Sequence, residues 1–179
     1  MNLVIGVTGL IISLIPLLVL PFKIKTGRAH YIQLYIFLVL YYLSLILYSL
    51  WPGDVPLLFI YLFEMLFFLN MYRAYLQKEL FFASTIPAIL YFNDLAIIFT
   101  FYFATFNLVE LARTTLKGRK TSPWVFSSLI FFELGIILQI LEIFNFQCYV
   151  SFYAMIPFLI GSILFIIPGL RVAYEEEKI

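Results

Sequence analysis

Long apolar runs alternate with short polar connections along the whole chain. Bilayer hydrocarbon is about 30 Å thick, so a helix that crosses it needs roughly 20 mostly apolar residues. The pattern therefore predicts an all-α fold, a polytopic transmembrane helical bundle with seven spans in a single integral membrane domain, 1–179. The predicted spans are 3–22, 31–51, 57–71, 79–92, 94–112, 123–144 and 149–170.

The longest stretch without Lys or Arg, 79–112, decides the number of spans. A single helix of that length would rise about 50 Å, well beyond the thickness of the hydrocarbon. We therefore expect the chain to turn at Asn93 and Asp94. Because the first part of this stretch, 79–92, is short and contains Pro87, a re-entrant pair of segments is an alternative to two full spans.

With seven spans, all the Lys and Arg residues fall on one face of the membrane. A six-span threading would divide the clusters at 73–78 and 113–120 between opposite faces, so we reject it. The positive-inside rule then places the N-terminus outside and the C-terminus in the cytoplasm of a multi-pass cell-membrane protein. The cytoplasmic cations expected to contact lipid headgroups or a partner are Lys23, Lys25, Arg28, Arg73, Arg113, Lys117, Arg119 and Lys120.

Composition supports the membrane class and narrows the function. The chain is 64% hydrophobic and 12% charged, whereas soluble domains are roughly 45 to 50% apolar and about a quarter charged. A net charge of +1 argues against a nucleic-acid partner. One Cys and one His give neither an intrachain disulfide nor a His-rich metal cluster, so we expect no cofactor and no metal. Without a phosphate loop or a catalytic set we expect no enzyme, and partners limited to the lipid bilayer and other membrane protein subunits.

Two acidic residues, Glu64 and Glu133, fall near the middle of predicted spans. An ionisable residue at that depth is costly and is by default a functional hypothesis. If the two spans are neighbours, the carboxyl groups could share a proton or coordinate a cation. The structural alternative is a glutamic acid that hydrogen-bonds a Tyr, Ser or Thr of a neighbouring helix and holds the bundle together.

Other polar residues have simpler interpretations at the ends of spans. Glu110 precedes Arg113 by three residues, a spacing that predicts an ion pair on one helix face. Asn70 and Asn107 each lie about one turn from a charged residue, and we interpret both as polar contacts at the membrane interface.

The topology invites comparison with known seven-span families. Microbial rhodopsins carry retinal on a lysine of the last span, and 149–170 has none. Transporters of the three-plus-one-plus-three type contain two matched repeats, in which span three corresponds to span seven and span two to span six. The central acids of this chain lie in spans three and six, which do not correspond to each other. The chain resembles the seven-helix membrane sensory region of some prokaryotic histidine kinases and receptors in span count, orientation and the basic loop 23–28 before an aromatic-rich second helix. The resemblance covers the whole chain and carries over no functional residue.

Two functional hypotheses follow from these patterns. The chain departs from the sensory family by ending at Ile179 without a cytoplasmic signalling domain, so we expect no independent signalling. The first hypothesis is a non-enzymatic, sensor-like or accessory membrane subunit that docks a partner. The second is a small proton- or cation-coupled transporter or channel that uses Glu64 and Glu133. Secondary transporters often contain internal repeats with broken helices, and we find no repeat here, so we favour the first.

Overall fold

The computed structural model describes residues 2–23, 29–76, 93–117, 122–146 and 152–175. The helices in these ranges are α1 (Asn2–Lys23), α2 (Ala29–Leu50), α3 (Asp54–Leu76), α5 (Asn93–Leu116), α6 (Pro123–Phe146) and α7 (Phe152–Glu175). The predicted fourth span, 79–92, lies outside the described residues.

Several of these helices suit a bilayer. By length and composition, α1, α2, α3, α6 and α7 can each cross a membrane. They contain 22 to 24 residues and so rise about 33 to 36 Å, close to the thickness of the hydrocarbon. Apolar side chains such as Val4, Leu18 and Leu47 are exposed on their outer faces. The all-α fold is that of a multi-pass membrane protein.

Helix α5 has the expected position but is more polar than the other five. It contains Thr100, Thr105 and Asn107 among its central residues, and it is not one of the helices whose hydropathy identifies a span. Thr100 and Asn107 are buried, and Thr105 and Asn107 hydrogen-bond the neighbouring helices. The polar groups of α5 therefore serve contacts between helices, which is a common arrangement inside membranes.

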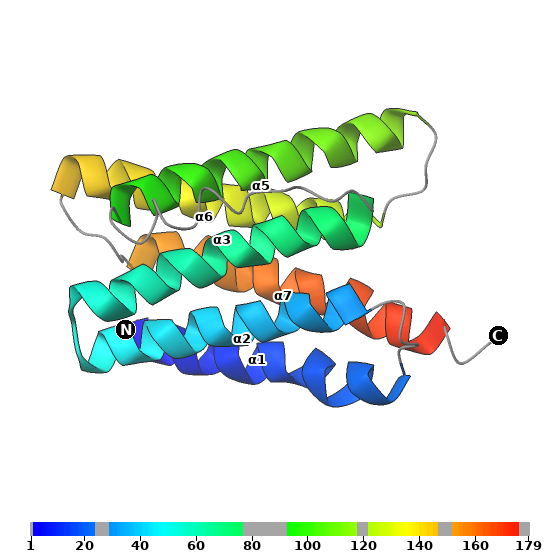
Figure 1. The fold of residues 1–179 in the computed structure, drawn as a ribbon, viewed down its shortest axis with the longest axis horizontal. Helices are drawn as coiled ribbons and strands as arrows, with labels where there is room; N and C mark the ends of the chain where they lie inside the picture. Colours follow the sequence, from blue (N-terminus) through cyan, green and yellow to red (C-terminus); the bar gives the residue numbers. More distant parts are fainter. Residues whose placement is uncertain (1, 24–28, 77–92, 118–121, 147–151, 176–179) are drawn as a thin grey trace.

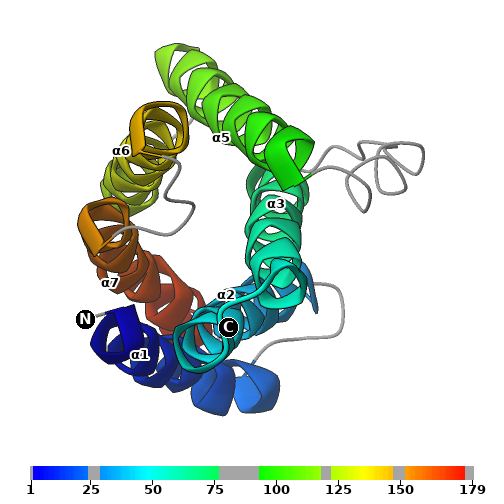
Figure 2. The same ribbon diagram turned by 90° about the vertical axis from the view of Figure 1, so that its left-hand side faces the viewer.

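The described helices form a closed ring. Each packs on two neighbours, in the order α1, α2, α3, α5, α6, α7 and back to α1, and Figure 2 shows this ring end on. Helices α1, α3, α5 and α7 run in one direction along the bundle, and α2 and α6 run in the other (Figure 1). Because α3 and α5 are parallel, Leu76 and Asn93 lie at opposite ends of the bundle.

Aromatic rings from four helices pack together inside the ring of helices. Phe67 and Phe68 of α3 contact Phe132 of α6, with ring centroids 5.3 and 5.8 Å apart and edge-to-face geometry. Phe158 of α7 stacks on Tyr41 of α2 at 4.8 Å. All five side chains are buried. Aromatic pairs in these geometries stabilise a core beyond the area they bury, so the centre of the bundle is a packed core.

Two tyrosines of α2 fasten that helix to α7. The hydroxyl of Tyr35 donates to the carbonyl of Phe165 at 2.7 Å, and the hydroxyls of Tyr42 and Ser162 lie 2.7 Å apart. Buried hydroxyls need such partners, because desolvating one without a hydrogen bond costs about 1 to 3 kcal/mol in proteins. These bonds set the position of α2 on α7.

Glycine makes the close packing around these tyrosines possible. Gly9 of α1 faces the ring of Tyr42, and Gly169 of α7 faces the hydroxyl end of Tyr35. At both glycines an added Cβ would overlap the tyrosine side chain. Small residues at helix contacts are typical of membrane bundles, where close approach of backbones replaces the hydrophobic effect as a source of stability.

The structure corrects the predicted start of the third helix. The prolines and glycine between the second and third predicted spans are typical of a turn, and the third span was predicted to begin at Leu57, but α3 begins at Asp54. Proline is tolerated in the first turn, and an aspartate there complements the helix dipole. The Leu57 amide already donates to the Gly53 carbonyl at 3.3 Å. The exposed turn between α2 and α3 is therefore shorter than the pattern predicts.

Candidate functional site

Glu64 lies near the middle of α3 on the face that points into the bundle. Residues buried on this face recur every three or four positions, as expected for one side of a helix. They are Leu57, Ile60, Tyr61, Glu64, Phe67, Phe68 and Met71. The sequence thus places one carboxyl group within an otherwise apolar and aromatic surface.

The carboxyl group of Glu64 is buried, and no described residue donates a hydrogen bond to it. Its side chain is 1% exposed, and within the described ranges neither oxygen has a hydrogen-bond partner. Tyr41 and Tyr42 of α2 lie close enough to interact with it electrostatically. A buried polar group without a partner lowers stability, so the arrangement is not explained by packing.

The tyrosines beside Glu64 are bonded to α7. Tyr41 donates to the sulfur of Met155 at 3.1 Å, and the Tyr42 hydroxyl pairs with Ser162. These bonds link α2 to α7, and the carboxyl group of Glu64 on α3 acts on the same two tyrosines through its charge. A change in that charge can therefore reach α7 through Tyr41 and Tyr42.

Glu133 has a different environment. It lies on α6 and faces α5, where its Oε1 accepts a 2.5 Å hydrogen bond from the hydroxyl of Thr105. Its Oε2 has no partner among the described residues, and the side chain is 9% exposed. The bond to Thr105 is the kind of contact expected if a glutamic acid at midspan holds neighbouring helices together.

Glu64 and Glu133 are not joined by a hydrogen bond. The condition for a shared site was that their helices be neighbours, and in the ring α5 lies between α3 and α6. The aromatic residue next to Glu133, Phe132, is the one that reaches across to α3. We therefore treat the two carboxyl groups as separate.

The described cations gather at one end of the bundle. The residues are Lys23, Arg73, Arg113, Lys117 and Arg171, all at or near the end at which α1, α3, α5 and α7 finish (Figure 1). We call it the basic end. The predicted contacts Lys25, Arg28, Arg119 and Lys120 lie outside the described residues. The predicted pair of Glu110 and Arg113 is confirmed, with 3.5 Å between Oε1 and Nη1.

Asn107, interpreted from the sequence as a polar contact at the membrane interface, is buried between helices. Asn107 is 3% exposed and its Nδ2 donates to the carbonyls of Phe68 and Phe103, both at 2.8 Å. It follows the buried Phe103 by four residues and precedes the buried Leu111 by four. That spacing was the available signal, because residues four apart share a helix face.

Neither cofactor chemistry nor similarity assigns this site. In the part of the chain that the structure describes, no three His, Cys, Asp or Glu side chains group as a metal ion would require. No protein-family model, curated protein or solved structure matches the chain.

Proposed function

We propose that the chain is a non-enzymatic protein of the cell membrane that crosses the bilayer seven times and acts as a sensor-like or accessory subunit. The parallel course of α3 and α5 supports a further crossing between Leu76 and Asn93. The cations at the basic end support an orientation with that end, and the C-terminus, in the cytoplasm, and with the N-terminus outside.

The proposed sensor role rests on the buried carboxyl group of Glu64. An ionisable group inside a membrane bundle is costly and marks functional sites by default. Here it has no hydrogen-bond partner among the described residues, and it faces tyrosines that are bonded to α7. A change in its charge, by movement of a proton or approach of a cation, would disturb Tyr41 and Tyr42 and through them α7. Such a response is what a membrane sensor requires.

The same carboxyl group supports a second candidate, a proton- or cation-coupled transporter. A path along the axis of the ring would require Phe67 and Phe158 to separate from Phe132, because the Phe132 ring contacts both of them. We favour the sensor because the packed interior supports a rearrangement of helices more directly than conduction between them.

Distance measurements between spin labels test the sensor. In a Cys148→Ser background, nitroxides attached at Lys117→Cys and Arg171→Cys report on the basic ends of α5 and α7, where both native side chains are exposed. We expect the distance distribution to differ between acidic and alkaline buffer, and Glu64→Gln to abolish the difference. Glu133→Gln is the matched control and should retain it. A distance distribution that is the same at acidic and alkaline pH in the protein with Glu64 intact would refute a charge sensor at Glu64.

Flux measurements separate the two candidates. Proteoliposomes with a trapped pH dye and an imposed pH gradient should lose the gradient no faster than empty vesicles. A faster loss that Glu64→Gln abolishes would replace the sensor with the transporter. If the vesicles show no faster loss, purification in mild detergent separates the remaining roles. An accessory subunit should co-purify with partner proteins, and a sensor that works alone should not.

A further inference from the structure

Two adjacent tyrosines of α2 differ in the strength of their hydrogen bonds to α7. The hydroxyl of Tyr41 donates to the sulfur of Met155 at 3.1 Å, and a thioether sulfur is a weak acceptor. The hydroxyl of Ser162 donates to the carbonyl of Phe158 at 2.9 Å, so Tyr42 is the donor in its 2.7 Å bond to Ser162. Tyr42 therefore has an oxygen acceptor, and Tyr41 has only the sulfur.

The carboxyl group of Glu64 lies in the same layer of the bundle as Tyr41. Glu64 and Phe68 are four residues apart and share one face of α3. The ring of Phe158 lies 6.4 Å from that of Phe68 and 4.8 Å from that of Tyr41. Glu64 also interacts electrostatically with Tyr41. Because neither oxygen of Glu64 has a hydrogen-bond partner among the described residues, the Tyr41 hydroxyl is bonded to Met155 alone in this structure.

The other titratable groups around Glu64 are tyrosines or lie away from it. Tyr42 of α2 interacts with its charge, and Tyr61 lies one turn earlier on the same face of α3. On α5 and α7, the described titratable side chains are at an exposed face or at the basic end; they are Tyr102, Glu110, Arg113, Lys117, Tyr153 and Arg171. Among the described side chains of these helices, no cation faces Glu64.

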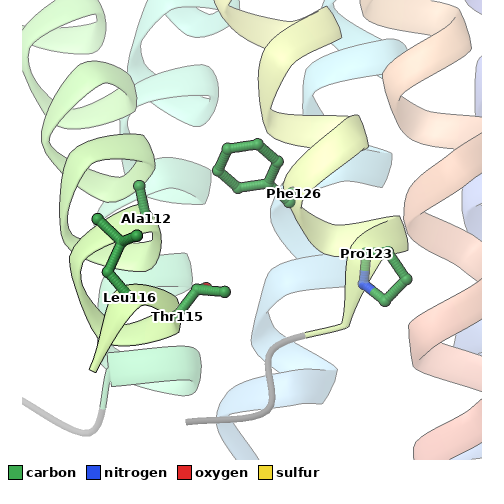
Figure 3. A pocket seen from close by; sticks show the side chains of 5 residues that line it. All are labelled: Ala112, Thr115, Leu116, Pro123 and Phe126. Carbon is green, nitrogen blue, oxygen red and sulfur yellow. The ribbon is translucent and has the colours of Figure 1, made fainter. Parts of the chain in front are cut away.

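A groove between the end of α5 and the start of α6 adds no titratable group. It has a volume of about 410 Å³ and is lined by Ala112, Thr115, Leu116, Pro123 and Phe126. In Figure 3 the Phe126 ring points into the space between the two helices, opposite Ala112 and Leu116. The Thr115 hydroxyl is bonded to a carbonyl of its own helix. A pH response of the bundle interior therefore has its source at Glu64 and not in this groove.

Loss of the proton from Glu64 changes which acceptor is best for Tyr41. A buried carboxylate without a hydrogen bond is far more costly than a buried neutral carboxyl group, and a hydrogen bond to a charged acceptor is stronger than one to a neutral acceptor. The Tyr41 ring is held by stacking on Phe158 and by an edge contact with Tyr42 at 5.1 Å. The flexible side chain of Glu64 is therefore the part that moves to reach the hydroxyl.

We propose that Tyr41 is the switch of the sensor: it bonds Met155 of α7 while Glu64 is protonated, and it bonds the Glu64 carboxylate of α3 after the proton is lost. The proposal rests on the proposed function and adds the hydroxyl through which the charge acts on α7. Met155 lies in the first turn of α7. The exchange therefore loosens α2 from α7 near the end opposite the basic end, while the bonds of Tyr35 and Tyr42 to α7 remain.

Spin labels at that end measure the exchange. In a Cys148→Ser background, Trp51→Cys lies directly after α2 and Tyr153→Cys lies at the start of α7, and the native side chains are 82% and 72% exposed. We expect the distance distribution to differ between acidic and alkaline buffer. Glu64→Gln should give the acidic distribution in both buffers. Tyr41→Phe and Met155→Leu should give the alkaline one in both, because each removes the bond between α2 and α7 at every pH.

Tyr35→Phe is the matched control. It also removes a tyrosine hydroxyl that bonds α2 to α7, but Tyr35 is not one of the tyrosines beside Glu64, and the pH response should be retained. Tyr41→Phe keeps the ring that stacks on Phe158. Met155→Leu exchanges apolar side chains of similar volume, a change that cores tolerate well, so two variants on opposite helices test the same bond.

Infrared spectra of the same samples separate failure of the switch from failure of the sensor. The carbonyl band of a protonated carboxyl group, assigned by its absence in Glu64→Gln, reports whether Glu64 loses its proton. If the band disappears at alkaline pH but Tyr41→Phe and Met155→Leu keep the distance change, the switch is wrong and the sensor stands. Loss of the response in Tyr35→Phe would equally overturn the switch, because any weakening of the contact would then suffice. A band that persists at alkaline pH overturns both proposals.

Discussion

The side-chain amide of Asn107 in α5 donates a 2.8 Å hydrogen bond to the main-chain carbonyl of Phe68 in α3. The same nitrogen bonds the carbonyl of Phe103 one turn earlier in its own helix. A buried amide thus uses both of its donors, one of them between helices. This contact fixes the most polar of the described helices against the helix that carries Glu64.

Asn107→Ala should destabilise the bundle by about 1 kcal/mol, because interhelical hydrogen bonds in membranes contribute roughly 0.6 and at most about 1.7 kcal/mol. Reversible unfolding in mixed micelles measures the loss. Asn70→Ala is the matched control, since among the described residues the Asn70 amide bonds the Leu66 carbonyl of its own helix and no other helix, and it should cost less. Equal losses would mean that the contact between α5 and α3 adds nothing.

Glu64→Leu should stabilise the protein, by about 1 to 3 kcal/mol, because it replaces a buried group that lacks a hydrogen-bond partner among the described residues with an apolar one of similar size. Glu133→Leu should have the opposite effect and cost about 1 to 2 kcal/mol, because it removes the acceptor of the Thr105 hydroxyl. The two variants are compared by the same unfolding assay. Destabilisation by Glu64→Leu would indicate a partner for that carboxyl group and would remove the argument that it is retained for function.

Gly169→Ala should destabilise the contact between α2 and α7 by about 1 to 3 kcal/mol, the usual effect of overpacking. The added methyl group would displace the hydroxyl end of Tyr35 and so break its bond to the Phe165 carbonyl. Gly53→Ala is the control, because the nearest atom to an added Cβ there lies 3.9 Å away. We expect the control to be close to neutral, and a similar loss at both sites would contradict the role of close packing.

Cysteine labelling tests the orientation. In a Cys148→Ser background, Asp54→Cys places a thiol at the end opposite the basic end, and Lys117→Cys places one at the basic end; both native side chains are exposed. An impermeant maleimide added to intact cells should label the first and not the second, and both should react after permeabilisation. Labelling of Lys117→Cys in intact cells would reverse the proposed orientation.

The sequence predicted the helices well because bilayer thickness controls both their length and their apolar pattern. It was less reliable where local signals compete. Pro52, Gly53 and Pro56 are typical of turns, yet a helix can start before a proline in its first turn, and α3 does so at Asp54. In α5, polar residues that bond neighbouring helices lower the hydropathy, and the span 94–112 was predicted instead from the lack of Lys and Arg in 79–112 and the expected turn at Asn93 and Asp94.

The partners of the candidate residues could not be predicted, because the order of helices around the ring is a tertiary property. Periodicity located Glu64 and Glu133 at midspan but did not show that α5 separates their helices. It also gave no reason to distinguish Glu133, which bonds Thr105, from Glu64, whose oxygens have no partner in the described ranges. The partner of Asn107 could not be predicted for the same reason, since it lies on another helix.

The contact between α1 and α7 closes the ring, and it can form only after the last helix has been synthesised. Chains are synthesised from the N-terminus, so α2 enters the bilayer before the helix that its tyrosines bond. Tyr35, Tyr41 and Tyr42 all find acceptors or donors in α7. Until α7 inserts, these hydroxyls lack their partners on α7 and face lipid. A ribosome that stalls before α7 would therefore release an intermediate with polar groups facing hydrocarbon, a form that membrane chaperones and proteases can select.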